Sequence, residues 1–385
     1  MNSVSSQSAR PLPGSTAGTG HAGSSNKLAL DYRREAALFP RVSRPIIDAH
    51  SHVMGRDAAG VYVDAARAFG VRLTYSMTPL PMVKPVREVM GESVRFIAIQ
   101  TWTDPDRNRA HRQGYIDAME TLAREHGSRM MKIWSAPRLR ELFPGESGAD
   151  LVEIDSPWRV KMGQAAEQLG MMIMVHVADP DTWFATKYSD AKIYRTKREQ
   201  YIGLERMLDK FTCPWIAAHM GGSSEDLDFL DGLLTRHPNL HIDTSATKWV
   251  VRELSKHPVS RVLEFFTRWQ DRILFGTDIV TSDDHLKPAK DNPAHPKADQ
   301  ANSPESAFDL YASRFWALRS VIGGGYAGPS PIADGDLAMV DPARFKPDDA
   351  PMLRGVSLPD GVLDKVMFAN AERVVGGWWN EHGGW

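Results

Sequence analysis

Five side chains of the types that bind divalent metals stand at the ends of short apolar runs in this sequence. They are, in chain order, His50 and His52 in "IDAHSH", His176 in "MVHVAD", His219 in "AAHMGG" and Asp278 in "FGTDIV". Imidazole nitrogen and carboxylate oxygen together suit Zn²⁺, Mn²⁺ or Fe²⁺, and the absence of cysteine from the set argues against a closed structural zinc site. A metal held with one open position lowers the pKa of a bound water. The pattern therefore predicts metal-assisted chemistry near neutral pH.

The pair His50 and His52 is ambiguous by itself, because two polar residues can simply mark the end of a strand. In a strand, however, residues i and i+2 point to the same face, so both imidazoles can face one cavity. A lone histidine such as His176 or His219 is more often held by a backbone hydrogen bond than by a metal. The presence of all five side chains at strand ends favours the metal site, but it leaves the roles of His176 and His219 interchangeable.

The elements that would bring these side chains together alternate between short apolar runs and longer amphipathic segments. The candidate strands are "RPIIDAH", "VRLTYSM", "RFIAIQTW", "RMMKIWSA", "MMIMVHVA", "WIAAHMGG", "NLHIDTSA" and "RILFGTDIV". Alternation of this kind predicts parallel strands joined by right-handed crossovers. Eight such units close a (β/α)₈ TIM barrel, an α/β fold whose active-site groups lie at the carboxyl ends of the strands. The alternative is an open doubly wound sheet, but no dinucleotide-binding or P-loop motif follows any of the runs.

Three regions fall outside that alternation. Residues 1–44 are rich in small and polar residues at their start and are predicted to form a disordered tail, with a transit peptide as the alternative. Residues 281–304 are polar and rich in proline, which is typical of a lid or specificity loop. Helix-like segments near the end of the chain predict a C-terminal helical extension. We expect residues 45–385 to form one metal-dependent TIM-barrel domain.

The composition narrows the classes of partner and compartment. The chain has 385 residues and a formal net charge of −2 with charges of mixed sign, so nucleic acid and anionic membranes are not expected partners. No apolar stretch approaches the roughly 20 residues of a membrane helix. Since Cys213 is the single cysteine, an intramolecular disulfide is impossible, and a reducing, cytoplasmic location is expected. The expected partner is a small-molecule substrate.

The motifs also resemble those of a known family. "IDAHSH", the histidine of "MVHVAD", "AAHMGG" and "FGTD" are similar to the motifs of the amidohydrolase superfamily. The narrower likeness is to the amidohydrolase-related branch that contains aminocarboxymuconate-semialdehyde decarboxylase, resorcylate-type decarboxylases and pyrone-dicarboxylate lactonases. The closing segment "LPDGVLDKVMFANAERVVG" resembles the final helix of that branch. The likeness extends over about residues 45–376, apart from 281–304 and 322–354.

The resemblance implies a role for each of the five side chains. His50, His52, His176 and Asp278 would be the ligands of one divalent metal, with zinc the first choice and manganese or iron as alternatives. His219 would lie beside the metal and polarise or deprotonate the bound water. Asp278 would also shuttle a proton, because a carboxylate that touches such a water can accept its hydrogen. Homodimers are common in the family, which makes a homodimer one assembly to consider for this chain.

Lys132 and Arg314 are candidates for further contacts to a substrate or a second metal. In binuclear members of the superfamily a lysine on the fourth strand is carboxylated and bridges two metals, and Lys132 in "RMMKIWSA" lies on that strand. Mononuclear relatives also carry a lysine there, so a substrate or structural contact is preferred for Lys132. Arg314, Arg138 and Trp183 lie in segments that can contact an anionic or aromatic substrate, with a surface or packing role as the alternative.

His241 and Asp243 in "LHIDTSA" repeat the H-x-D spacing of a ligand pair. The resembled family has no ligand on the seventh strand. A role in the barrel core or in support of the ligands is therefore expected for both residues.

Two reactions fit such a site. The first is hydrolysis, in which a metal-activated water attacks the carbonyl of an amide, lactone or ester of a small carboxylated or aromatic substrate. The second is non-oxidative decarboxylation of an aromatic or unsaturated acid, and a hydratase is a further option in the same branch. A metal-binding scaffold without catalysis is disfavoured because all five side chains are present. We predict the hydrolase, with the decarboxylase as the alternative, since fold and metal site do not fix the reaction.

Overall fold

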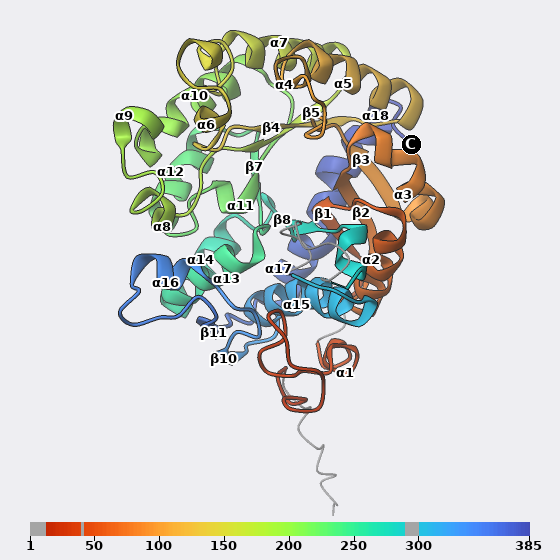
Figure 1. The fold of residues 1–385 in the computed structure, drawn as a ribbon, viewed down its shortest axis with the longest axis vertical. Helices are drawn as coiled ribbons and strands as arrows, with labels where there is room; N and C mark the ends of the chain where they lie inside the picture. The colour runs from red at the N-terminus through yellow and green to blue at the C-terminus, as the bar shows by residue number, and fades with distance from the viewer. Residues whose placement is uncertain (1–12, 40–41, 289–299) are drawn as a thin grey trace, which may run out of the picture.

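The computed structural model describes residues 13–39, 42–288 and 300–385. Parallel strands form a ring near the centre of the molecule, and helices pack around the outside of that ring (Figure 1). All eight predicted strands are present: β1 Ile46–His52, β2 Val71–Met77, β3 Val94–Ile97, β4 Met130–Trp134, β5 Met172–His176, β6 Trp215–Ala217, β7 Leu240–Asp243 and β8 Ile273–Leu274. Their near-continuous burial explains why they read as apolar runs, since strands of a barrel are covered on both faces.

Hydrogen bonds between neighbouring strands close the ring. The strands form two ladders, β3-β2-β1-β9 and β4-β5-β6-β7-β8, where β9 is Ile279–Val280. The ladders meet at Ala98, whose N–H donates to the Met130 carbonyl at 2.8 Å and whose carbonyl accepts from the Lys132 amide at 2.9 Å. They meet again where the Ala49 amide donates to the Phe275 carbonyl at 2.9 Å. The predicted (β/α)₈ barrel is confirmed, and β8 and β9 are two parts of one predicted strand.

Longer helices alternate with the strands and cover the barrel. They are α2 Arg56–Ala68, α3 Val83–Met90, α5 Gln113–His126, α7 Pro157–Gln168, α10 Lys197–Lys210, α12 Leu227–Arg236, α13 Thr247–Lys256, α14 Val259–Arg268 and α15 Pro304–Ile322. Sequence signals mark their starts: Thr196 and Glu199 form a capping box before α10, and Ser303 caps α15 ahead of Pro304.

Short elements lie in the connections. They are α4 Arg107–Ala110, α6 Leu139–Leu142, α8 Asp181–Phe184, α9 Ala191–Tyr194, α11 Ala218–Gly221, α16 Asp336–Val340, and the strands β10 Ala327–Pro329 and β11 Met352–Arg354, which pair as an antiparallel hairpin. Within the described ranges, no helix is long and apolar enough to cross a membrane.

A C-terminal helical segment closes the amino-terminal end of the barrel. It runs through α17 Asp360–Asp364, two π-helical stretches at Lys365–Ala369 and Ala371–Gly376, and α18 Gly377–Glu381. The side-chain amide of Asn370 donates to the carbonyls of Gln270 and Ile273, both at 2.7 Å, where β8 begins. Trp379 packs edge-on against Tyr75 of β2, with ring centroids 5.1 Å apart. The predicted C-terminal helical extension is confirmed, and its apolar side chains complete one part of the core.

Residues 13–39 pack against the barrel, so the prediction of a disordered tail over residues 1–44 was wrong for this part. Leu30, Tyr32 and Phe39 are buried and belong to the main hydrophobic core. The composition of the segment conceals these few large apolar side chains among small and polar ones. Residues 1–12 and 40–41 of the predicted tail lie outside the described residues.

Glu35 ties this N-terminal segment to α15. It lies in helix α1 (Tyr32–Ala36) and is fully buried. Its carboxylate accepts hydrogen bonds from the Gly14 and Thr16 amides at 2.6 and 2.9 Å and from Trp316 Nε1 at 2.7 Å. Charge-assisted bonds from a backbone loop and a buried tryptophan therefore hold the segment in place.

The predicted lid over residues 281–304 lies partly outside the described residues, which end at 288 and resume at 300. Its first part forms a 3₁₀ turn at Asp283–Leu286, and the Asp283 carboxylate accepts from the Ala58 amide at 2.9 Å. Gly55, with a φ of 86°, allows this approach, because a Cβ there would lie 2.4 Å from Asp283 Oδ1. The start of the loop is thus bound to the start of α2.

His241 makes the stability of the barrel dependent on pH. Its side chain is 7 % exposed in β7, and burial, aided by the charges of Arg272 and Arg373, lowers its pKa to about 4. The unfolded chain protonates this histidine below about pH 6.5, whereas the folded chain keeps it neutral to about pH 4. We therefore expect His241 to remove up to roughly 3 kcal/mol of stability as the pH falls through that window.

Urea denaturation at several pH values checks this expectation. The variant His241→Gln cannot gain the proton, so its free energy of unfolding should fall less steeply between about pH 6.5 and 4 than that of the natural protein. Parallel curves for the two proteins across that window would contradict the assignment.

Candidate metal centre

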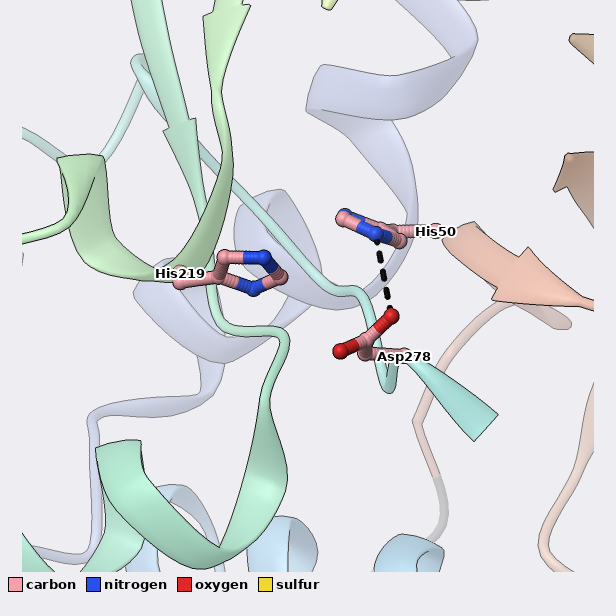
Figure 2. A group of neighbouring side chains, drawn as sticks. All are labelled: His50, His219 and Asp278. Atoms are coloured by element: carbon pink, nitrogen blue, oxygen red, sulfur yellow. Dashed lines mark ion pairs between the residues drawn. The ribbon is translucent and has the colours of Figure 1, made fainter. Parts of the chain in front are cut away.

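The barrel brings His50, His219 and Asp278 together at one point (Figure 2). One ring nitrogen of each histidine and one carboxylate oxygen of Asp278 all lie within 4.8 Å of one another. His50 belongs to β1, His219 to the turn after β6, and Asp278 to the break between β8 and β9. Parallel strands in a closed barrel end on the same face, which explains why residues so distant in sequence converge.

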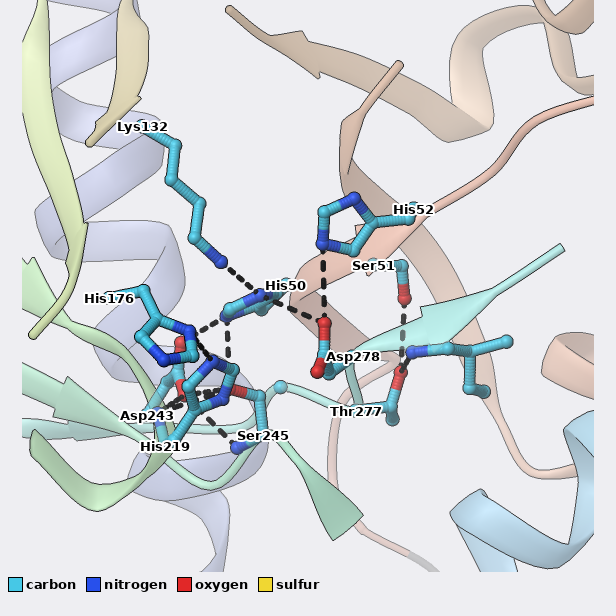
Figure 3. Close-up of polar contacts among 12 residues, drawn as sticks. His50, Ser51, His52, Lys132, His176, His219, Asp243, Ser245, Thr277 and Asp278 are labelled. Carbon is cyan, nitrogen blue, oxygen red and sulfur yellow. Dashed lines mark hydrogen bonds and ion pairs between the residues drawn. The ribbon is translucent and has the colours of Figure 1, made fainter. Parts of the chain in front are cut away.

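His52 faces the same carboxylate as His50. Nε2 of His52 lies 3.2 Å from Asp278 Oδ1, and Nε2 of His50 lies 3.3 Å from that oxygen (Figure 3). This arrangement agrees with the i, i+2 spacing in β1, which directs both rings to one side. Asp278 itself has a left-handed backbone conformation, with a φ of 58°, and interrupts the strand at this residue. Two imidazoles therefore point at one carboxylate oxygen.

His176 lies beside this group and is connected to it through His219. His176 Nδ1 is 3.0 Å from His219 Nε2, and His176 Nε2 is 2.9 Å from Asp179 Oδ1. His219 opens a left-handed turn, with a φ of 60°, that continues to Gly222. Left-handed conformations of non-glycine residues are costly and cluster at functional sites. All five predicted side chains thus gather at one end of the barrel.

Lys132 reaches the same point from β4. Its ammonium nitrogen lies 2.8 Å from His50 Nε2, and the residue is only 3 % exposed. Burial lowers the pKa of Lys132 to about 8, against the opposing effect of the Asp278 and Asp243 carboxylates. Lys132 thus has a structural contact with the site, while a contact with substrate and carboxylation of its side chain stay predictions.

Asp243 and Ser245 contact both His50 and His219 (Figure 3). Asp243 is fully buried; its Oδ2 lies 2.7 Å from His50 Nδ1, and its Oδ1 accepts from the His219 amide at 2.9 Å. Ser245 Oγ lies 2.9 Å from His50 Nδ1 and 2.8 Å from His219 Nδ1, and it donates to Asp243. A proton on His50 Nδ1 satisfies Asp243 and leaves Nε2 free to bind a metal.

The supporting role of Asp243 was predicted, whereas Ser245 was missed. The available signal was its i, i+2 spacing from Asp243 at the end of β7, which directs both side chains to one face.

Burial and charge set the protonation states of the site. Burial lowers the pKa of His52 to about 4 and that of His219 well below its usual range, despite the nearby Asp278. For His50, burial and Lys132 lower the pKa, but Asp243 and Asp278 outweigh them and raise it. Burial would raise the pKa of Asp278, yet hydrogen bonds from His50 and His52 keep it well below its usual range.

The donor set fits a divalent metal. The low pKa of His52 favours its neutral imidazole and that of Asp278 its ionised carboxylate, which are the protonation states in which these groups bind metals. His50 and His176 each have a second ring nitrogen next to a carboxylate, from Asp243 and Asp179, which is the usual support of a metal-binding histidine. The site therefore has both the ligand types and the outer hydrogen bonds of a divalent metal centre.

A cavity of about 710 Å³ contains this site. His52, Lys132, His176, His219 and Asp278 all contribute to its lining. Four tryptophans also line it: Trp102, Trp134, Trp183 and Trp249. The barrel end is thus a pocket with polar groups at one place and aromatic walls around them, as expected for a small-molecule site.

Only some of the residues that were predicted to contact substrate line the cavity. Arg314 and Trp183 line the cavity. Arg138 does not line it; this arginine is exposed and lies 3.5 Å from Glu141 in an ion pair. Ser24 and Ser25 also line the cavity, and they were missed because the sequence predicted disorder for that segment.

Three solved structures align with most of this chain. An uncharacterized TIM-barrel protein from Bordetella bronchiseptica is 13 % identical with a TM-score of 0.46, covering 87 % of this chain and 99 % of its own. A probable 2-pyrone-4,6-dicarboxylic acid hydrolase from Acinetobacter baumannii is 9 % identical with a TM-score of 0.43, covering 86 % and 99 %. The 5-carboxyvanillate decarboxylase from Novosphingobium aromaticivorans is 11 % identical with a TM-score of 0.41, covering 88 % and 96 %.

A family model gives the assignment. The sequence matches none of the curated proteins with which it was compared. Residues 47–377 match the model described as amidohydrolase, a span that includes every strand-end motif and most of the C-terminal helical segment. The resemblance predicted from those motifs is confirmed. The chain belongs to the amidohydrolase family of metal-dependent enzymes.

Proposed function

We propose that this enzyme is a metal-dependent hydrolase that cleaves an amide, lactone or ester of a small carboxylated or aromatic substrate. The observation that carries the proposal is the convergence of His50, His219 and Asp278 beside the 710 Å³ cavity, which His219 and Asp278 line. We assign His50, His52, His176 and Asp278 as the ligands of one divalent metal, with zinc as the preferred ion. When bound, that ion would polarise the scissile carbonyl and acidify water.

His219 is the proposed general base. Its buried, neutral imidazole can accept a proton from the attacking water. Ser245 Oγ lies 2.8 Å from His219 Nδ1, and a proton on that nitrogen orients the ring and leaves Nε2 to act as the base. Asp278, ionised between two imidazoles, can accept a second proton and pass it to the leaving group. Lys132 is placed to stabilise negative charge on the substrate.

The aromatic lining of the cavity favours a second candidate. Trp102, Trp134, Trp183 and Trp249 can enclose an aromatic ring or an unsaturated acid. On such a substrate the same site would serve a non-oxidative decarboxylase or a hydratase. In the decarboxylase, His219 or Asp278 would supply the proton that replaces carbon dioxide at carbon.

The remaining proposals concern the whole protein. We infer that residues 45–385 act as one catalytic unit on a small-molecule substrate and that the 281–304 loop adjusts specificity. A reducing, cytoplasmic location is supported by Cys213, the only cysteine of the sequence, which is a buried thiol. A homodimer is the assembly to test first, by light scattering.

A product assay in isotopically labelled water distinguishes the two reactions. Zinc- or manganese-loaded protein would be incubated with a panel of lactones, aromatic amides and hydroxylated aromatic acids in H₂¹⁸O or D₂O. Hydrolysis is expected to place one ¹⁸O atom in the product carboxylate without release of carbon dioxide. Carbon dioxide release with deuterium gained at carbon would overturn the hydrolase in favour of the decarboxylase. Equal turnover by metal-free and metal-loaded protein would overturn both.

The variant His219→Gln tests the proposed base. We expect it to retain bound metal and to lower kcat about 10²- to 10⁴-fold, the usual contribution of a general base. The control His257→Gln changes a histidine that contacts the Ser224 carbonyl at 2.9 Å outside the cavity lining, and it should leave kcat unchanged. Loss of metal together with activity in His219→Gln would instead make His219 a ligand.

A further inference from the structure

Arg314 brings a positive charge into the cavity without a carboxylate partner. It lies on α15, half-buried, and lines the cavity. Its Nη1 donates to Ser25 Oγ at 3.2 Å and to Ser313 Oγ at 2.8 Å. Arg314 makes no ion pair with any acidic residue in the part of the chain that the structure describes. A guanidinium has five N–H donors, so two hydroxyl contacts to one nitrogen leave Nε and Nη2 for a ligand.

Lys248 adds a second charge to the same wall. It lies in α13, lines the cavity with an exposed side chain, and has no hydrogen bond or ion pair among the described residues. Desolvation in the cavity and then the positive charge of Arg314 lower the pKa of Lys248. Two neighbouring cations repel each other, and a bound anion would remove that repulsion.

The acidic residues on this wall are already engaged. Asp334 and Asp336 line the cavity, but both contact the buried Arg252, Asp336 at 3.6 Å. Asp336 also accepts a hydrogen bond from Trp183 Nε1 at 2.9 Å. Both carboxylates partly offset the charge of Lys248, but neither forms an ion pair with Lys248 or Arg314 in the described part of the chain.

The N-terminal segment sets the position of Arg314. The Ser25 carbonyl accepts from the Tyr32 hydroxyl at 2.8 Å, which fixes the residue whose Oγ contacts the arginine. On either side, the Ala333 amide donates to the Ser24 carbonyl at 3.2 Å, and the Lys27 amide donates to the Pro331 carbonyl at 2.8 Å. The segment is thus bonded to residues 331–333 and builds part of the cavity wall.

We propose that Arg314 and Lys248 form a subsite for a carboxylate that the substrate carries apart from its reacting group, and that Ser25 is a positioning residue for Arg314. The planar guanidinium matches a carboxylate with paired N–H donors, and the ammonium adds a point charge. Neither cation hydrogen-bonds to the five metal-site side chains within the described residues. The substrate class is therefore a small acid with a second polar or acidic group at the metal site. This inference rests on the proposed function only in taking the cavity as the substrate pocket.

Two probes that differ by one charge test the subsite. Isophthalate and monomethyl isophthalate would be titrated into metal-loaded protein by calorimetry. The natural protein should prefer isophthalate, and Arg314→Met should reduce that preference about 10- to 100-fold, because a hydrogen bond to a charged group contributes roughly 1.5–3 kcal/mol. Lys248→Met should reduce it less, and Ser25→Ala by a few-fold. The matched control Arg138→Met removes an exposed arginine outside the cavity and should leave the preference unchanged.

Metal content and turnover are measured separately from the binding of the two probes. A failure of the proposed reaction can therefore be distinguished from a failure of the subsite. Once a substrate is known, Arg314→Met should raise KM for the acid and leave kcat nearly unchanged, with full metal content. Equal affinity of the natural protein for the two probes, or an unchanged preference in Arg314→Met, would overturn the subsite. If Arg314→Met does not fold, the preference for isophthalate is measured in Arg314→Lys and Lys248→Met instead. An unchanged preference in both variants would overturn the subsite.

Discussion

His50→Ala is expected to release the divalent metal and to lower kcat/KM by about a thousandfold or more. His50 lies within hydrogen-bond distance of Lys132 and Asp243 and 3.3 Å from Asp278, so its imidazole is at the centre of the polar cluster. A catalytic metal contributes several kcal/mol of transition-state stabilisation, and each 1.4 kcal/mol corresponds to a factor of ten in rate. The measurement is metal content by plasma mass spectrometry together with kcat/KM on the substrate found by the labelled-water assay.

The matched control for that variant is His126→Ala. His126 lies in the last turn of α5, on the outside of the barrel, and contacts Phe96 and Arg87. It should retain both metal and activity. A His50→Ala protein that keeps its metal and its turnover would refute the assigned centre, even if the fold is intact.

Asp243→Asn should weaken metal binding, through the histidines and not through direct contact with substrate. The change keeps the shape of the side chain but removes the charge that faces His50 Nδ1 at 2.7 Å. Asp243 also raises the pKa of His50, so its loss makes that imidazole a weaker ligand. Outer hydrogen-bond partners of this kind change metal affinity about 10- to 100-fold, and we expect a decrease of that size.

Competition with a chromophoric chelator would measure the affinity. Ser245→Ala retains the carboxylate and removes one hydroxyl, so its effect should be smaller than that of Asp243→Asn. Asp231→Asn is the control, because Asp231 lies on α12 and binds Arg261 and Trp269 away from the cavity. Equal metal affinity in Asp243→Asn and the natural protein would show that His50 needs no fixed tautomer.

Much of the barrel can be predicted because its strands are local patterns. The strands are mostly buried runs, and β1, β5 and β7 carry a polar residue at the carboxyl end, which a barrel places on one face. His50 and His52 illustrate this: the period of two within β1 is enough to direct both rings to Asp278. The capping box at Thr196 and Glu199 is a local pattern of the same kind, because its two residues lie three positions apart at the start of α10.

Contacts between residues that are far apart in the sequence were harder to predict. Residues 13–39 appeared disordered because a mostly small and polar segment cannot bury enough surface by itself. Glu35 and Ser25 accept hydrogen bonds from Trp316 and Arg314 on α15, which lies far along the chain. No local period in the segment indicates those partners.

The sequence by itself determined the set of candidate metal-binding side chains, the eight strands that carry them and the family to which the motifs belong. The tertiary structure decided which of these side chains meet: His219 joins His50 and Asp278, and His176 contacts them through His219. It also paired His50 with Asp243 across 193 residues and Ser25 with Arg314 across 289. The physical reason is the distance along the sequence over which each effect acts. The periodicity of a strand determines where its own side chains point, whereas closure of the barrel and packing determine which distant residues those side chains face.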